Sequence, residues 1–143
     1  PYVMPSISGS FDTRLKQIII QCGVLETGTV KNLQNNKTSN KINVYNALID
    51  TGANATAISS KIAKDLSLQH HSIAQNATAG GIIESNIYDI DLILGFGNTG
   101  IPIEKLRVIE ANLPDNFDIL LGMDVILRGQ LHISHDHHFS FSI

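Results

Sequence analysis

Hydrophobic residues along the 143-residue chain gather in short runs. Most runs are rich in β-branched residues or alternate with polar ones, and Gly, Asn or Ser bounds them, which is typical of β-strands. We expect strands at 16–26, 42–49, 57–59, 72–94 with a turn at Gly80-Gly81, 102–111, and in the closing QLHIS and FSFSI segments. Residues 30–34 either continue the first strand or form the next one, and turns are expected at 35–41 and 95–100.

Helical spacing occurs in SKIAKDL, residues 60–66, where Ile62, Ala63 and Leu66 fall on one face and Ser59 or Ser60 can cap the start. A further helical turn or two is expected after the Gly in FDILLGMDVILRG, residues 117–129. The polar, Gly- and Ser-containing residues 1–14 predict a flexible N-terminal arm, which leaves 15–143 as one domain. Many short strands with one or two short helices predict a mostly β barrel or sandwich.

Composition excludes several classes of function. Net charge is −3 and Lys plus Arg number 10, so no electrostatic footprint for nucleic acid is present. No apolar run approaches the roughly 20 residues that span a bilayer. Cys22 is the only cysteine, so no disulfide forms within one chain, and a cytoplasmic location is favoured. Because the first residue is Pro1, an upstream targeting or anchoring segment that has been removed stays an open alternative.

A carboxylate in an unusual place carries the candidate chemistry. Asp50 ends the apolar run ALI and is followed by Thr51, Gly52 and the small Ala53. The tripeptide alone also suits a turn. A carboxylate at a buried edge is costly unless it is paired, however, which favours a site over a turn. The later ILLG at 119–122 supplies a second apolar strand that ends in Gly, and the Gly-Gly hairpin between them could act as a lid.

These pieces together resemble the retropepsin-like aspartic proteases, in the version found in cellular and bacterial members. The resemblance rests on LIDTGA (48–53), ATAGGIIESNIYDI (77–90) and DILLGMD (118–124), in family order. It implies a closed β-barrel-like acid-protease fold that works as a homodimer without a cofactor, with one Asp from each subunit. Two close carboxylates sharing one proton have split pKa values. The ionised one then activates a water, and the protonated one donates to the developing oxyanion.

The resemblance also implies roles for individual residues. Asp50 is the catalytic carboxylate, Thr51 bonds across the two-fold axis, and Gly52 lets the substrate backbone approach. The expected substrate-binding residues are Ala53, Asn54, Ala79, Gly80, Gly81 and Ile82, the last four forming the tip of a flap over an extended peptide. We expect pocket walls from Ile49, Ile82, Ile83, Leu121 and Val125. Asp12-Thr13 is not a second motif, because Arg14 stands where backbones must approach closely.

Two features depart from the viral pattern. Asn54 and Asp124 stand near positions that are acidic and Arg, respectively, in many viral members, so a hydrogen bond between them is expected as a substitute. The segment after Gly129 is also longer and His-rich, which puts the usual terminal-strand dimer interface in doubt. Its histidines (132, 135, 137 and 138) could hold a metal, but a polar turn between closing strands is favoured.

Other candidate groups receive structural interpretations. Asp89 and Asp91 should share one exposed strand face, and Cys22 should be a small buried residue. The sequence therefore predicts an aspartic endopeptidase that acts on peptide or protein substrates as a homodimer, with no metal, nucleic-acid partner or membrane segment. The alternatives are a module of the same fold that dimerises or binds peptides without cleaving them, and a latent protease that is monomeric until it meets a partner. Whether Pro1 marks a processing site stays open.

Overall fold

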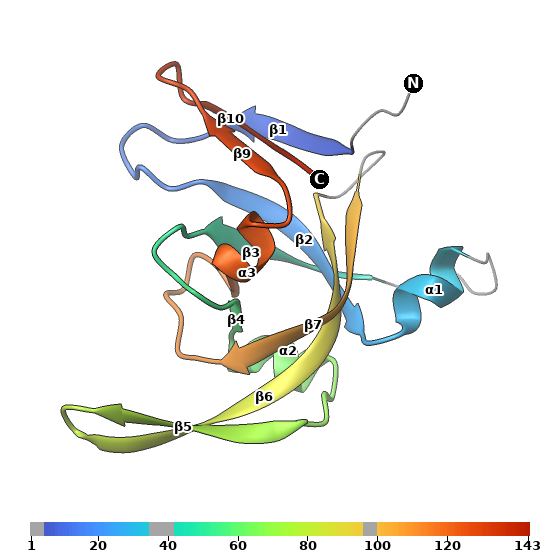
Figure 1. Ribbon diagram of the computed structural model, residues 1–143, viewed down its shortest axis with the longest axis vertical. Helices are drawn as coiled ribbons and strands as arrows, with labels where there is room; N and C mark the ends of the chain where they lie inside the picture. Colours follow the sequence, from blue (N-terminus) through green and yellow to red (C-terminus); the bar gives the residue numbers. More distant parts are fainter. Residues whose placement is uncertain (1–4, 35–41, 96–99) are drawn as a thin grey trace.

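The computed structural model describes residues 5–34, 42–95 and 100–143, which form ten strands and three short helices (Figure 1). The strands are β1 (Ser6–Ser10), β2 (Ile19–Glu26), β3 (Asn43–Ile49), β4 (Ala57–Ile58), β5 (Ser72–Thr78), β6 (Gly81–Leu94), β7 (Ile101–Glu110), β8 (Ile119–Leu121), β9 (Gln130–Ile133) and β10 (His138–Ser142). The helices are α1 (Thr29–Gln34), α2 (Ser60–Asp65) and α3 (Met123–Ile126). The expected hairpin tip at 35–41 lies outside the described residues, as do residues 96–99 of the expected turn at 95–100. No described helix has the length and apolar character needed to cross a membrane.

The main sheet closes on itself. Its strands run in the order β2-β3-β8-β4-β7-β6-β5, and an additional pairing of β2 with β6 joins the ends of the first six. Most pairs are antiparallel, but β3–β8 and β4–β7 are parallel. Fully buried side chains such as Val24, Ile58, Ile90 and Leu92 fill the interior, each contributing about 1.5–3 kcal/mol by its burial. The predicted mostly β, closed barrel-like fold is confirmed.

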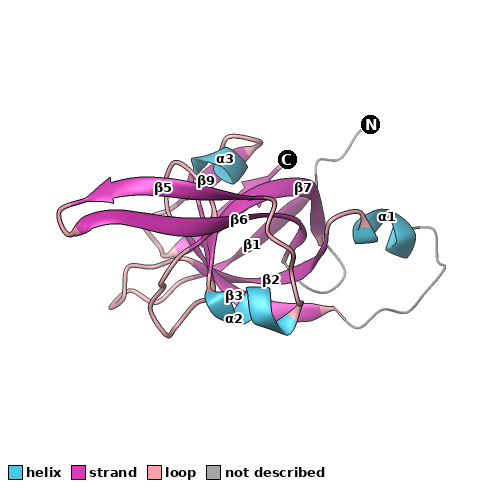
Figure 2. Cartoon of the chain, turned by 90° about the horizontal axis from the view of Figure 1, so that it is seen from below, coloured by secondary structure: helices cyan, strands magenta, loops and turns pink. Residues whose placement is uncertain are grey.

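Strand β6 belongs to two structures at once. Its first half, Gly81 to Ile87, pairs with β5 in a hairpin, and its second half pairs with β7 and β2 in the barrel. Figures 1 and 2 both show the β5–β6 hairpin reaching well past the barrel. The hairpin is therefore an extension of a barrel strand rather than a separate loop.

The two ends of the described chain meet in a second sheet. Strand β1 pairs with β10, and β10 pairs with β9. Ile7, Phe139 and Phe141 point from this sheet into the core. Residues Ser6–Ser10 were expected to lie in a flexible arm, but they form a strand. Ile7 is the one large apolar residue there, so the local pattern is weak and the strand depends on its partner β10.

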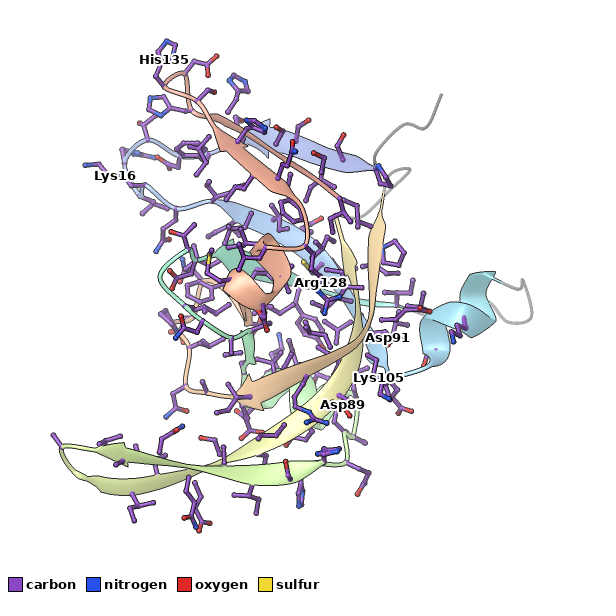
Figure 3. All side chains as sticks on the ribbon, in the orientation of Figure 1. Lys16, Asp89, Asp91, Lys105, Arg128 and His135 are labelled. Atoms are coloured by element: carbon purple, nitrogen blue, oxygen red, sulfur yellow. The ribbon has the colours of Figure 1, made fainter. Side chains whose placement is uncertain are left out.

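Two expectations about the α1 side of the barrel were wrong. Residues 30–34, expected as strand, lie in α1. Asp91, expected on an exposed face with Asp89, is fully buried on the side of the barrel where α1 lies (Figure 3). The register shift at this point lies in β7, which has one extra residue opposite Asp91. The Asp91 carboxylate accepts hydrogen bonds from the backbone N–H groups of Val30 (3.1 Å) and Lys105 (2.8 Å). The buried charge is thus satisfied, and it fixes the start of α1.

The His-rich segment lies at the turn between β9 and β10, as the favoured interpretation predicted. His135 stands at the tip of this turn in Figure 3. His138 contacts Asp136 at 3.4 Å, and the Ser134 hydroxyl donates to the same carboxylate. The ring of His137 meets Phe11 edge-on. In the described parts of the chain, no three His, Cys, Asp or Glu side chains lie together as metal ligands would.

Candidate active site

Asp50 lies at the point where β3 leaves the barrel. Its backbone N–H donates to the Leu121 carbonyl at 2.9 Å, and its own carbonyl accepts from Ala53 at 3.2 Å. The Asp50 carboxylate accepts from the Gly52 N–H at 2.8 Å. Asp50 is partly buried, whereas Thr51 and Gly52 are exposed. The backbone is therefore held firmly while the carboxylate faces a surface that another group can reach.

The LLGMD segment holds the loop after Asp50 in place. Met123 and Asp124 donate their backbone N–H groups to the carbonyls of Ala53 (2.7 Å) and Asn54 (3.3 Å). A Cβ on Gly122 would lie 2.7 Å from the carbonyl carbon of Ala55. Only glycine allows the two backbones to pack this closely, so the co-occurrence of DTGA and LLGMD has a direct structural basis.

Thr56 is a residue of this region that sequence reasoning missed. It is fully buried, and its hydroxyl donates to the Asp124 carboxylate at 2.7 Å and accepts from the Gly122 N–H at 3.2 Å. The Thr56 N–H donates to the second Asp124 oxygen at 3.0 Å. The expected hydrogen bond between Asn54 and Asp124 is present, but it joins the Asp124 N–H to the Asn54 carbonyl, and the Asp124 carboxylate bonds Thr56. A hydroxyl between the small apolar residues of ATAIS was the available signal.

The predicted flap tip is the turn of the β5–β6 hairpin. Thr78 pairs with Gly81, which leaves Ala79 and Gly80 as the turn, and Gly81 has a φ of 122° that favours glycine. Ile82 follows with 71% of its side chain exposed. In Figure 1 the hairpin projects on the side of the barrel where the loop between β3 and β4 lies. Within the described residues, no hydrogen bond joins this tip to the Asp50 loop.

The expected pocket walls are only partly at the surface. Ile82 and Ile83 are exposed on the hairpin, but Leu121 and Val125 are almost fully buried. The last two line a small internal space with Ile49 between the barrel and the terminal sheet. Leu121 and Val125 are therefore core residues rather than surface pocket walls.

The root of the hairpin carries an ordered polar group. Tyr88 is almost fully buried, and its hydroxyl donates to the Glu110 carboxylate at 2.9 Å and accepts from the Asn86 amide at 3.3 Å. Burial raises the pKa of Tyr88, and the hydrogen bond to Glu110 raises it further. The phenol therefore stays protonated and keeps the Glu110 carboxylate in place.

Two other reactive groups lie away from Asp50. Cys22 is fully buried, and this burial raises its pKa to about 12, so it stays a neutral thiol. Asp12 is bonded to its neighbour Arg14, whose backbone and guanidinium hydrogen bonds lower the pKa of Asp12. Asp12 also lies in a loop that precedes β2, not after a barrel strand.

Comparison with known proteins agrees with this architecture. A crystal structure of a retropepsin-like aspartic protease from Rickettsia conorii matches with a TM-score of 0.60 over 99% of this chain and 95% of that one, at 14% identity. At this identity the match shows a common fold. No curated protein matches the sequence. A family model described as a gag-polyprotein putative aspartyl protease matches residues 36–128, which include the Asp50 loop, the hairpin and the Gly122 segment. The chain therefore belongs to the retropepsin-like aspartyl protease family.

Proposed function

We propose that the protein is an aspartic endopeptidase that cleaves extended peptides as a homodimer, with Asp50 of each subunit forming one catalytic pair. The observation that carries the proposal is the Asp50 loop, which is clamped from behind by the Gly122 segment and exposes Thr51 and Gly52. Asp12, the other Asp-Thr position, is tied to Arg14 and does not form a second such loop. Each chain therefore offers one. A second copy of the chain must supply the other carboxylate.

The chemistry follows from two carboxylates that share one proton. The ionised Asp50 takes a proton from a bound water, which attacks the scissile carbonyl, and the protonated Asp50 donates to the oxyanion. Thr51 then braces the two loops against each other. Gly52 accommodates the substrate backbone, and Ala53 and Asn54 border the peptide on the same side.

The hairpin supplies the other wall of the proposed cleft. Ala79, Gly80, Gly81 and Ile82 close over a peptide that lies as an added strand. Ile82 is exposed in the single chain, so its side chain is available to cover an apolar substrate residue. The reaction needs no cofactor.

Cleavage of a mixed peptide library at about pH 4–6 tests this proposal. The native chain should cleave the library, Asp50→Asn should lose cleavage by about 100-fold or more, and Asp12→Asn should keep it. Sedimentation should show a dimer in the active preparation. Unchanged cleavage by Asp50→Asn would rule out the aspartic mechanism.

A latent form of this enzyme is a second candidate, because the strands of the barrel and of the terminal sheet all come from one chain. Such a chain folds without a partner and leaves Asp50 unpaired. Cleavage per mole of chain should then rise with protein concentration until the dimer saturates. A rate per chain that stays constant over a thousandfold dilution would contradict it.

A further inference from the structure

A polar pocket near the hairpin lies where β6 and β7 separate. The pairing of β6 with β7 ends at Ile87 and Ile109. Beyond this point β6 extends into the hairpin, and the segment that follows β7 turns away from it. Residues 83–86 and 110–112 line a pocket of about 200 Å³ in the resulting wedge. Among the described strands, none pairs with this edge of β6 between Ile83 and Asn86.

This pocket borders the proposed cleft. Ala111 donates its N–H to the carbonyl of Ile58, and Ile109 donates to that of Thr56, so the pocket wall adjoins the loop that carries Asp50. Three strand spacings separate β7 from β3 through β4 and β8, which is about 14 Å along the sheet. An extended peptide advances about 3.3 Å per residue, so the pocket would meet a side chain roughly four residues from the scissile bond.

The ionisable side chains that line the pocket are all acidic. Glu110 is held by the buried Tyr88 hydroxyl, and Glu84 faces the pocket from β6 with one oxygen bonded to Gln75 at 3.3 Å. Asn86 adds an amide, and no Lys, Arg or His is among the lining residues. Within the described chain, Glu110 has no ion-pair partner. A fixed, partly buried carboxylate without a cation favours a cationic ligand group.

We propose that Glu110 determines specificity for a lysine or arginine side chain of the substrate, about four residues from the scissile bond. The inference rests on the proposed function, because it assigns the occupant of a pocket in the same cleft. The two-fold axis of the dimer places one such pocket at each end of the peptide. Glu84 contributes less, because it is exposed.

Binding to the Asp50→Asn chain tests the pocket without relying on cleavage. The probes are ten-residue peptides with a central apolar pair and Lys, norleucine or Glu at a single position, which is moved three, four or five residues from the centre. At one of these positions the Lys peptide should bind about fivefold more tightly than the norleucine peptide. Adding Glu110→Gln should remove the preference while keeping an acceptor for Tyr88, and Glu110→Lys should favour the Glu peptide.

The control is Glu104→Gln, an exposed carboxylate of β7 outside the pocket, which should keep the preference for Lys. Equal binding of the Lys and norleucine peptides at all three positions would overturn the inference, as would a preference that survives Glu110→Gln or no peptide binding at all. A preference for Lys in binding, with no cleavage by the native chain, would leave the inference intact and contradict the proposed protease activity.

Discussion

The loop that carries Asp50 and the hairpin of β5 and β6 differ in how they are held in place. Backbone and side-chain hydrogen bonds tie the loop to the segment after β8, and the fully buried Thr56 is at their centre. The outer hairpin bonds only within itself, and Ile73, Ile82 and Ile83 remain exposed on it. One wall of the proposed cleft is therefore fixed by the core, and the other can open at little cost.

This difference matches what the proposed reaction needs. Two carboxylates that share a proton must hold their separation closely, which a clamped loop provides. A polypeptide must enter and leave, which requires a wall that moves. Substitutions of matched residues in the two regions test this difference.

The largest contrast should come from glycine. Gly122→Ala places a Cβ 2.7 Å from the Ala55 backbone, so it should lower the free energy of unfolding by about 1–3 kcal/mol and displace the Asp50 loop. Gly80→Ala meets no atom within 4 Å and should change the stability little. Urea denaturation measures both variants, and peptide cleavage should fall far more for Gly122→Ala. Equal stability of the two variants would show that the loop is not clamped.

Threonine gives the next largest contrast. Thr56→Val leaves Asp124 and the Gly122 N–H without the hydroxyl and should cost about 1–3 kcal/mol of stability. Thr78→Val removes an exposed hydrogen bond to the Gly81 carbonyl and should change stability by less than about 0.5 kcal/mol. Thermal unfolding of the two variants side by side checks this order. The clamp would lose its central role if Thr56→Val were as stable as Thr78→Val.

Hydrogen exchange compares the two regions without a mutation. The amides of Thr56 and Met123 should exchange close to the rate of global unfolding, because they donate across a buried junction. Amides of the outer hairpin, such as that of Ile82, should exchange through local opening. Nuclear magnetic resonance resolves them individually. Similar protection in both regions would mean that the hairpin is as rigid as the loop.

The smallest effect concerns an exposed turn, which resembles the hairpin in exposure but depends on charge. Hydrogen bonds from Ser134 and His138 lower the pKa of Asp136 below its ordinary value of 3.8. Its stabilisation is therefore complete above pH 3.8 and is lost as the pH falls through the lowered pKa. The His138 resonances should shift over this acid range, and Asp136→Asn should abolish the shift. Asp136→Asn should leave cleavage at about pH 4–6 unchanged.

Sequence patterns predicted the elements whose own residues carry the signal. The apolar run before Asp50 and the spacing of Ile62, Ala63 and Leu66 each gave the observed element. The Gly80-Gly81 pair gave the hairpin, although its turn lies one residue earlier, at Ala79-Gly80. The order of the DTGA and LLGMD motifs also gave the family. These features are local, so a reader of the sequence can find them.

The missed features depend on distant partners. Helix α1 starts where Asp91, about sixty positions later, accepts the Val30 N–H, and a bulge in β7 brings the Lys105 N–H to the same carboxylate. Strand β1 forms only because β10 lies beside it. The Asp124 carboxylate could bond either Asn54 or Thr56, and the sequence does not show that Asn54 is exposed while Thr56 is buried. Such choices are decided by packing, which a pattern does not contain.

Strand β6 behaves mechanically as a cantilever that is anchored in the barrel and free at the hairpin tip. Deflection under load grows with distance from the anchor, so the tip at Gly80 is its most compliant point and the root near Tyr88 its stiffest. A short peptide would press only against the compliant end. A longer peptide would also contact the stiff root beside Glu110. Turnover should therefore rise with substrate length even when the residues at the scissile bond stay the same.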